Sequence, residues 1–135
     1  MTRGLLNHLD LTVTDLPGSA AFYDQVLPEL GYTRSTQYAG EVPCWAIGEF
    51  SIGLHPARSG RAHDRYSPGL HHLAFHAESR EAVDRFHRFL QDRRLPVLDA
   101  PAEYEYTSGY YAVFFTDPDG IKLELVFEPR LHTSV

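Results

Sequence analysis

The chain has 135 residues, 43% of them hydrophobic and 22% charged, and a formal net charge of −6. That length suits a single domain with a substantial core, and the lack of a basic stripe argues against a nucleic-acid partner. No segment approaches the roughly 20 apolar residues of a membrane helix. The single cysteine excludes an internal disulfide. We therefore expect a cytoplasmic globular protein without a membrane partner.

The first half of the chain predicts one strand, one helix and three further short strands. Apolar and polar residues alternate over residues 6–14, which is the period of a half-buried strand. Asp15 is a suitable helix cap, Pro17 is tolerated in a first turn, and Gly31 is typical of a helix end. The three short strands are expected over residues 32–57, with breaks at 40–43 and 48–49.

The second half predicts the same order of elements. A strand is expected over residues 70–77, and Ser79 caps a helix that must end before Pro96. A polar linker joins the halves at residues 59–68. The remaining expectations are a short strand around Val97, a long loop over 99–109, and strands over 110–116 and 121–127.

Two histidines, His8 and His72, occupy matching places in the halves, and Phe22 and Phe86 keep the same offset of 64 residues. The chain therefore looks like one βαβββ unit used twice, over residues 5–57 and 69–128, within one domain. Since neither half can close a core alone, we expect an α+β fold of paired, curved mixed sheets. These half-barrels would carry the helices on their outer faces.

Strand alternation places metal-competent side chains on one inward face. That face would carry His8 and Asp10 on the first strand, His55 on the fourth, His72 on the fifth and Glu124 on the last. Two imidazoles and one carboxylate suit a divalent ion that keeps coordination positions open. The alternative is a polar sheet face that simply meets water, which is common in antiparallel sheets.

Two polar residues on this face, Asp10 and His76, each have a functional and a structural interpretation. Asp10 is either a general base or orienter of an imidazole, or a solvated strand carboxylate. His76 is either a proton shuttle or a surface histidine. Trp45 is interpreted as core, and Cys44, which has no evident base beside it, as a poor nucleophile.

Four tyrosines crowd the long loop and the strand that follows it. Such a cluster forms either an aromatic lid over a planar or apolar substrate, or the rim of the core or a subunit contact. These candidate substrate-binding residues are Tyr104, Tyr106, Tyr110 and Tyr111.

Over essentially its whole length the chain resembles the vicinal oxygen chelate superfamily, which includes glyoxalase I, fosfomycin-resistance transferases, bleomycin-resistance proteins, methylmalonyl-CoA epimerase and extradiol dioxygenases. Each short motif is weak alone, but their order and spacing together are specific. The motifs are Asn7-His8-Leu9, residues 15–19 with Phe22-Tyr23, His72-Leu73-Ala74-Phe75, and residues 117–120 followed by Leu123-Glu124-Leu125.

The resemblance implies that His8, His72 and Glu124 bind the metal. Glyoxalase I and the epimerase add a Glu or Gln from the fourth strand, where this chain has Gly53 and His55. His55 is either that fourth ligand or a polar residue at a strand end, and its register favours the second interpretation.

The resemblance further implies a metal-dependent enzyme, with Zn, Ni, Mn or Fe as cofactor, acting on a small oxygen-chelating substrate. Lyase, isomerase or thiol-transfer chemistry is expected. The alternatives are a non-catalytic, antibiotic-binding protein and a ring-cleaving dioxygenase, and the cleft closes either within one chain or in a homodimer.

Overall fold

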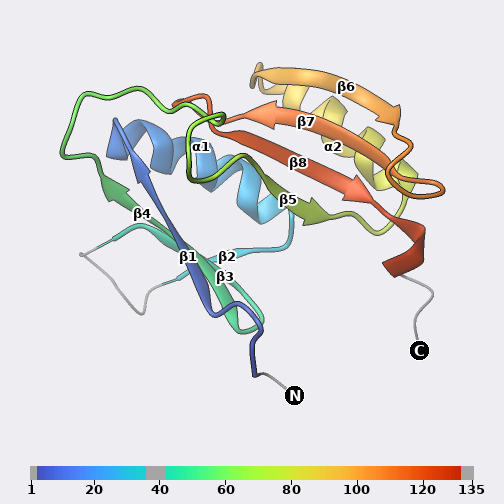
Figure 1. The fold of residues 1–135 in the computed structure, drawn as a ribbon, viewed down its shortest axis with the longest axis horizontal. Helices are drawn as coiled ribbons and strands as arrows, with labels where there is room; N and C mark the ends of the chain where they lie inside the picture. The colour runs from blue at the N-terminus through green and yellow to red at the C-terminus, as the bar shows by residue number, and fades with distance from the viewer. Residues whose placement is uncertain (1–2, 36–41, 132–135) are drawn as a thin grey trace. The chain divides into compact units, whose positions relative to one another are not determined.

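The computed structural model describes residues 3–35 and 42–131 of the chain. The chain divides into two compact units, Met1–Ala62 and His63–Val135. Within the described residues, each unit holds one four-stranded sheet and one α-helix (Figure 1). The division falls inside the segment that the sequence predicted as a polar linker.

The first unit begins with strand β1 (His8–Val13) and helix α1 (Leu16–Glu29). Strand β1 runs parallel to β4, and the other strand pairs are antiparallel. The sheet order is β1-β4-β3-β2, completed by β2 (Thr33–Arg34), β3 (Cys44–Ile47) and β4 (Phe50–Pro56).

The second unit repeats this topology. Strand β5 (Leu73–His76) and helix α2 (Arg80–Asp92) come first, and β5 runs parallel to β8. The order β5-β8-β7-β6 is completed by β6 (Val97–Glu103), β7 (Tyr111–Thr116) and β8 (Lys122–Phe127), with a short 3₁₀ helix at Pro129–Leu131. The predicted α+β class and repeated βαβββ order are confirmed.

Both helices begin where a short polar side chain caps them. Asp15 accepts the backbone N–H of Gly18 at 3.2 Å, and Ser79 accepts that of Ala82 at 3.0 Å. A Cβ on Gly18 would lie 2.4 Å from a carboxylate oxygen of Asp15, so the absent side chain makes room for the cap. Helix α1 ends at Glu29 with Leu30 as its C-cap, and the next residue, Gly31, has a φ of +95°, the left-handed conformation that glycine tolerates.

Each helix packs its apolar stripe on the sheet of its own unit. In β1, Leu11 and Val13 are buried whereas His8, Asp10 and Thr12 are exposed, as the alternation predicted. The buried side chains of α1 include Phe22, Val26 and Leu27, and those of α2 include Val83, Phe86 and Leu90. The polar side chains of β1 therefore lie on the sheet face away from α1.

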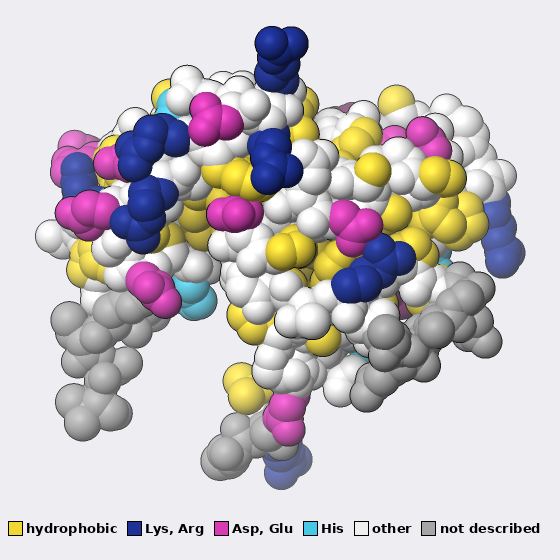
Figure 2. Space-filling model, turned by 180° about the vertical axis from the view of Figure 1, so that it is seen from behind, with side chains coloured by type: hydrophobic (Ala, Val, Ile, Leu, Met, Phe, Trp, Pro, Cys, Tyr) yellow, Lys and Arg dark blue, Asp and Glu magenta, His cyan; other side chains and the backbone are white. Residues whose placement is uncertain are grey.

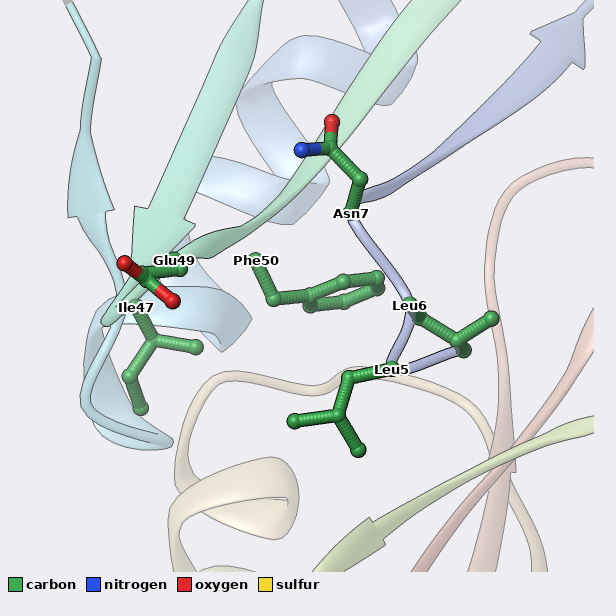
Figure 3. Close-up of a pocket in the computed structure, with 6 residues that line it drawn as sticks. All are labelled: Leu5, Leu6, Asn7, Ile47, Glu49 and Phe50. Carbon is green, nitrogen blue, oxygen red and sulfur yellow. The ribbon is translucent and has the colours of Figure 1, made fainter. Parts of the chain in front are cut away.

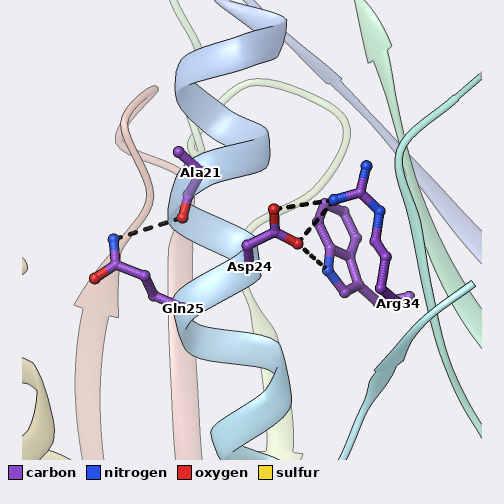
Figure 4. Close-up of polar contacts among 5 residues, drawn as sticks. Ala21, Asp24, Gln25 and Arg34 are labelled. Carbon is purple, nitrogen blue, oxygen red and sulfur yellow. Dashed lines mark hydrogen bonds and ion pairs between the residues drawn. The ribbon is translucent and has the colours of Figure 1, made fainter.

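Helix α1 is also fixed to its sheet through one carboxylate. Asp24 accepts two hydrogen bonds from the Arg34 guanidinium, at 2.8 and 2.9 Å, and one from the indole N–H of Trp45 at 2.9 Å (Figure 4). Arg34 lies 5.0 Å from the centroid of the same indole. Trp45 is fully buried, as the sequence predicted for a core residue, and this bond satisfies its N–H.

Two sequence predictions were wrong at element boundaries. The loop predicted over 99–109 is strand up to Glu103, because β6 continues through a register shift between Asp99 and Ala102. Pro101 lies within this shift on an edge strand, where a missing N–H costs no ladder bond. The strand predicted over 70–77 is shorter, so His72 lies just before β5 rather than within it.

The surface carries mixed charges. On the face seen in Figure 2, Lys and Arg side chains are interspersed with Asp and Glu. Among the residues that the structure describes, no helix has the length and apolar character needed to cross a membrane. The strand break predicted at residues 40 and 41 lies outside the described residues.

Candidate functional site

In the first unit, Asp10 lies between two imidazoles. Nε2 of His55 lies 3.1 Å from Oδ2 of Asp10, and Nε2 of His8 lies 4.0 Å from the same oxygen. The parallel register of β1 and β4 pairs Asp10 with Gly53 and Thr12 with His55. The side chains of Asp10 and His55 therefore lie on the same face of the sheet. These three groups line a cavity of about 170 Å³, which Val42, Cys44, Ser51 and Gly53 complete.

Gly53 makes room for the Asp10 carboxylate. The two residues are register partners, and a Cβ on Gly53 would lie 2.7 Å from Oδ1 of Asp10. The equivalent register pair in the second unit is Ala74 and Glu124. Each pair combines one acidic residue with one small residue, but the carboxylate is on β1 in the first unit and on β8 in the second. Asp10 therefore occupies space that a larger side chain at position 53 would need.

In the second unit, Glu124 is buried, and each of its two carboxylate oxygens contacts another side chain. Its side chain is 1% exposed, and Oε1 lies 3.1 Å from Nε2 of His72. Oε2 accepts the phenolic proton of Tyr110. Burial first, and then this bond to the carboxylate, raise the pKa of Tyr110, so the phenol remains a donor. A carboxylate removed from water needs such partners.

The residue before each candidate histidine contacts its Nδ1. The amide oxygen of Asn7 lies 2.8 Å from Nδ1 of His8, and Nδ1 of His71 lies 2.7 Å from Nδ1 of His72. Because an amide oxygen only accepts, Nδ1 of His8 carries the proton and Nε2 keeps its lone pair. Desolvation, followed by nearby positive charge, lowers the pKa of His71.

Sequence reasoning missed Asn7 and His71. Both were visible as neighbours of repeat-equivalent histidines, since positions 7 and 71 share the offset of positions 8 and 72. Metal-binding histidines usually give their second ring N–H to such a partner, which fixes the ring and the tautomer.

The four tyrosines divide between two places. Tyr104 and Tyr110 pack against a buried cluster of Ala112, Phe114 and Val126, on the face that carries Glu124. Tyr106 is 69% exposed and stacks on Tyr104, with ring centroids 5.6 Å apart. Tyr111 points to the helix side instead, where its hydroxyl donates to Asp84 of α2 at 2.6 Å. Tyr104, Tyr106 and Tyr110 therefore form one group of contacting rings, of which Tyr110 contacts Glu124, and Tyr111 lies elsewhere.

Two further features are His76 and a second cavity. His76 is an exposed residue at the end of β5. The cavity, of about 650 Å³, is lined by Leu5, Leu6, Asn7, Ile47, Glu49 and Phe50 (Figure 3). Four of these six residues are apolar, and Glu49 is the only ionisable one among them, so the cavity offers no set of metal ligands.

The described residues supply metal-binding groups in pairs rather than triplets. Within the ranges 3–35 and 42–131, no three His, Cys, Asp or Glu side chains lie close enough to hold an ion. The pair in the second unit has the donors that a divalent ion prefers. The contact of 3.1 Å between Nε2 of His72 and Oε1 of Glu124 suits either a hydrogen bond donated by Nε2 or, when Nδ1 carries the proton, a cation bound by both atoms.

Known proteins resemble this chain along most of its length. A sequence model of the Glyoxalase/Bleomycin resistance protein/Dioxygenase superfamily matches residues 5–125. YqjT of Bacillus subtilis (strain 168), a protein described as uncharacterised, is 35% identical over 90% of this chain and 97% of its own length. The metallothiol transferase FosB of Staphylococcus saprophyticus is 27% identical over 89% of this chain and 74% of its own length.

Solved structures agree with that match. A candidate glyoxalase from Bacillus halodurans superposes with a TM-score of 0.81 at 34% identity, covering 94% of this chain and 98% of the other. A glyoxylase/bleomycin resistance protein/dioxygenase domain from Frankia sp. EAN1pec has a TM-score of 0.72 at 25% identity, over 90% of both chains.

Proposed function

This chain belongs to the Glyoxalase/Bleomycin resistance protein/Dioxygenase superfamily, and from that premise we propose that it is a metal-dependent enzyme. Its substrate would be a small molecule whose two neighbouring oxygens chelate the ion. The observation that carries the proposal is the contact between Nε2 of His72 and Oε1 of the buried Glu124, at 3.1 Å. A charged carboxylate at 1% exposure is expensive unless a cation compensates it.

The proposed ligands are His72 and Glu124, which contact each other, and His8, the repeat equivalent of His72. Their donor set of two imidazole nitrogens and one carboxylate oxygen suits Zn, Ni, Mn or Fe. Asn7 and His71 support this assignment, because each contacts Nδ1 and leaves Nε2 available as a ligand. Tyr110 would hold the second carboxylate oxygen and so favour coordination of Glu124 through Oε1 alone.

When bound, the ion would polarise the substrate oxygens as a Lewis acid. Asp10 is the proposed general base, because its carboxylate is about half exposed and borders the 170 Å³ cavity. His55 would position Asp10 through the 3.1 Å contact rather than act as a fourth ligand. Tyr104, Tyr106 and Tyr110 would border the substrate on the side of Glu124.

The proposed reaction is isomerisation, lyase chemistry or addition of a thiol. Gly53 leaves the fourth strand without a carboxylate, which favours a three-ligand site over a four-ligand one. The similarity to a protein named as a metallothiol transferase supports thiol addition among these options. A small-molecule binding protein without turnover is the second candidate, since the stack of the half-buried Tyr104 and the exposed Tyr106 would serve binding equally well.

Metal content tests the proposal directly. Protein purified without a histidine tag should carry about one divalent ion per site by elemental analysis, and added metals should raise its melting temperature. Glu124→Gln should weaken metal binding while the fold survives. Glu105→Gln, which removes the same charge from an exposed position, is the matched control.

The outcomes separate the two candidate functions. Absence of bound metal, together with a melting temperature that no metal raises, would leave only the binding protein. Unchanged metal affinity in Glu124→Gln would remove Glu124 from the ligand set. Turnover assays with each metal, on methylglyoxal–thiol adducts, fosfomycin with thiols, and catechols, then identify the reaction.

A further inference from the structure

The turn that joins β6 to β7 carries the group of contacting tyrosine rings. The backbone N–H of Tyr104 donates to the carbonyl of Tyr110 at 3.0 Å, and the N–H of Tyr110 donates to the carbonyl of Thr107 at 3.2 Å. The turn therefore begins and ends at the two tyrosines that pack against the buried apolar cluster of β7 and β8. Where the turn lies decides where both of these rings lie.

The tip of this turn contacts the segment that follows β8, at the same end of the sheet of the second unit (Figure 1). The hydroxyl of Thr107 donates to Oε2 of Glu128 at 3.1 Å. A Cβ on Gly109 would lie 2.8 Å from Cγ of Pro129, and the φ of Gly109 is +78°, so this close approach depends on glycine. We call these two contacts, Thr107 with Glu128 and Gly109 with Pro129, the C-terminal latch.

Glu128 is a strong acceptor for the turn. The residue is 9% exposed, and the oxygen that accepts the Thr107 hydroxyl also accepts the Nε–H of Arg130. The bond from Arg130, and then that from Thr107, lower the pKa of Glu128, so the carboxyl is ionised at neutral pH. A hydrogen bond to an ionised acceptor is stronger than one between neutral groups. The latch therefore holds the turn through a charge-assisted bond.

The latched turn carries the phenol that contacts the buried carboxylate. Tyr110 is the third residue after Thr107, and its hydroxyl donates to Oε2 of Glu124. The ring centroid of Tyr106 lies 5.6 Å from that of Tyr104 and 5.1 Å from that of Tyr110. A displacement of the turn would therefore move all three rings and the donor to Glu124 together.

We propose that Thr107 and Gly109 are positioning residues, which hold the phenol of Tyr110 on Oε2 of Glu124 through the latch and so keep Oε1 available to a ligand. The two residues contact the latch and not the carboxylate of Glu124, so they act through Tyr110 alone. That the ligand of Oε1 is a metal rests on the function proposed above. The latch itself does not depend on a metal.

Thr107→Val tests the latch, because it replaces the hydroxyl with a methyl group of similar size. In metal-free protein with isotope-labelled tyrosine, the ring signals of Tyr110, assigned with Tyr110→Phe, should shift in NMR spectra. Competition with a chromophoric chelator should show a roughly three- to tenfold loss of zinc affinity, smaller than for losing a direct partner of a ligand. Thr107→Ser keeps the donor and should restore both values. Ser108→Ala, which removes an exposed hydroxyl from the same turn, is the matched control and should change neither.

Gly109→Ala disrupts the other contact of the latch and should shift the same Tyr110 signals. Unchanged Tyr110 signals in Gly109→Ala and Thr107→Val would overturn the latch, and so would a shift in Thr107→Ser as large as in Thr107→Val. Shifted signals with unchanged zinc affinity would overturn the positioning role at Glu124. A parent protein that binds none of the proposed metals would overturn the proposed enzyme instead, and the tyrosine signals would still decide whether the latch holds Tyr110.

Discussion

The amide oxygen of Asn7 accepts the Nδ1 proton of His8 at 2.8 Å, which leaves Nε2 of that imidazole with its lone pair. One repeat later, Nδ1 of His71 lies 2.7 Å from Nδ1 of His72. The two residues that orient the proposed ligands therefore precede them directly in sequence. A substitution at Asn7 should therefore change metal binding through His8, although Asn7 itself is not a proposed ligand.

Asn7→Ala should weaken metal affinity by about 10–100-fold, the usual effect of losing a partner that orients a ligand. The dissociation constant can be measured by competition with a chromophoric chelator. Asn7→Asp keeps an acceptor oxygen at the same place and should retain most of the affinity. Equal losses in both variants would show that Asn7 does not act through the His8 tautomer.

Tyr110→Phe should destabilise the second unit by about 1–3 kcal/mol, because a buried carboxylate oxygen loses its donor. It should also weaken metal affinity, since Glu124 is no longer held through Oε2. Denaturant unfolding measures the first effect and chelator competition the second. Tyr106→Phe is the control: its ring is 69% exposed, so both values should be unchanged.

Gly53→Ala should displace the Asp10 carboxylate, since the new Cβ would lie 2.7 Å from Oδ1. The displaced group is the end of a side chain, so we expect little loss of folding stability. The His55 ring signals in NMR spectra should shift, and turnover should fall with metal affinity unchanged. Gly60→Ala is the matched control, because its Cβ would meet nothing within 4 Å. Unshifted His55 signals would contradict the predicted displacement.

Glu128 should make stability depend on pH on the acid side. Its hydrogen bond from Arg130, and then that from Thr107 at 3.1 Å, lower the pKa of Glu128 below 4.5. A carboxyl group whose pKa is lowered in the folded state stabilises the protein above pH 4.5. This stabilisation is lost as the pH falls from 4.5 through the pKa of the folded state. Glu128→Gln should therefore have a lower melting temperature near pH 7, and its melting temperature should decline less steeply as the pH falls below 4.5. A decline as steep as in the parent protein would exclude this source of acid sensitivity.

The order of elements, the caps and the inward faces could be predicted because they depend on neighbouring residues. Asp15 and Ser79 cap the helices where the sequence placed them, and β1 buries Leu11 and Val13 while exposing Asp10. The repeat at an offset of 64 residues was visible in the sequence alone. It predicted two units of one topology, which the sheets confirm.

The sequence by itself determined the repeated fold and the residue types of the candidate site. Only the tertiary structure decided that Asp10 fills the space left by Gly53, that Tyr110 bonds Glu124, and that Tyr111 lies on the helix side. It also decided that β6 continues past Pro101 as an edge strand. Periodicity and capping act between residues a few positions apart, whereas these contacts join distant strands, and their register is fixed by packing that no local pattern records.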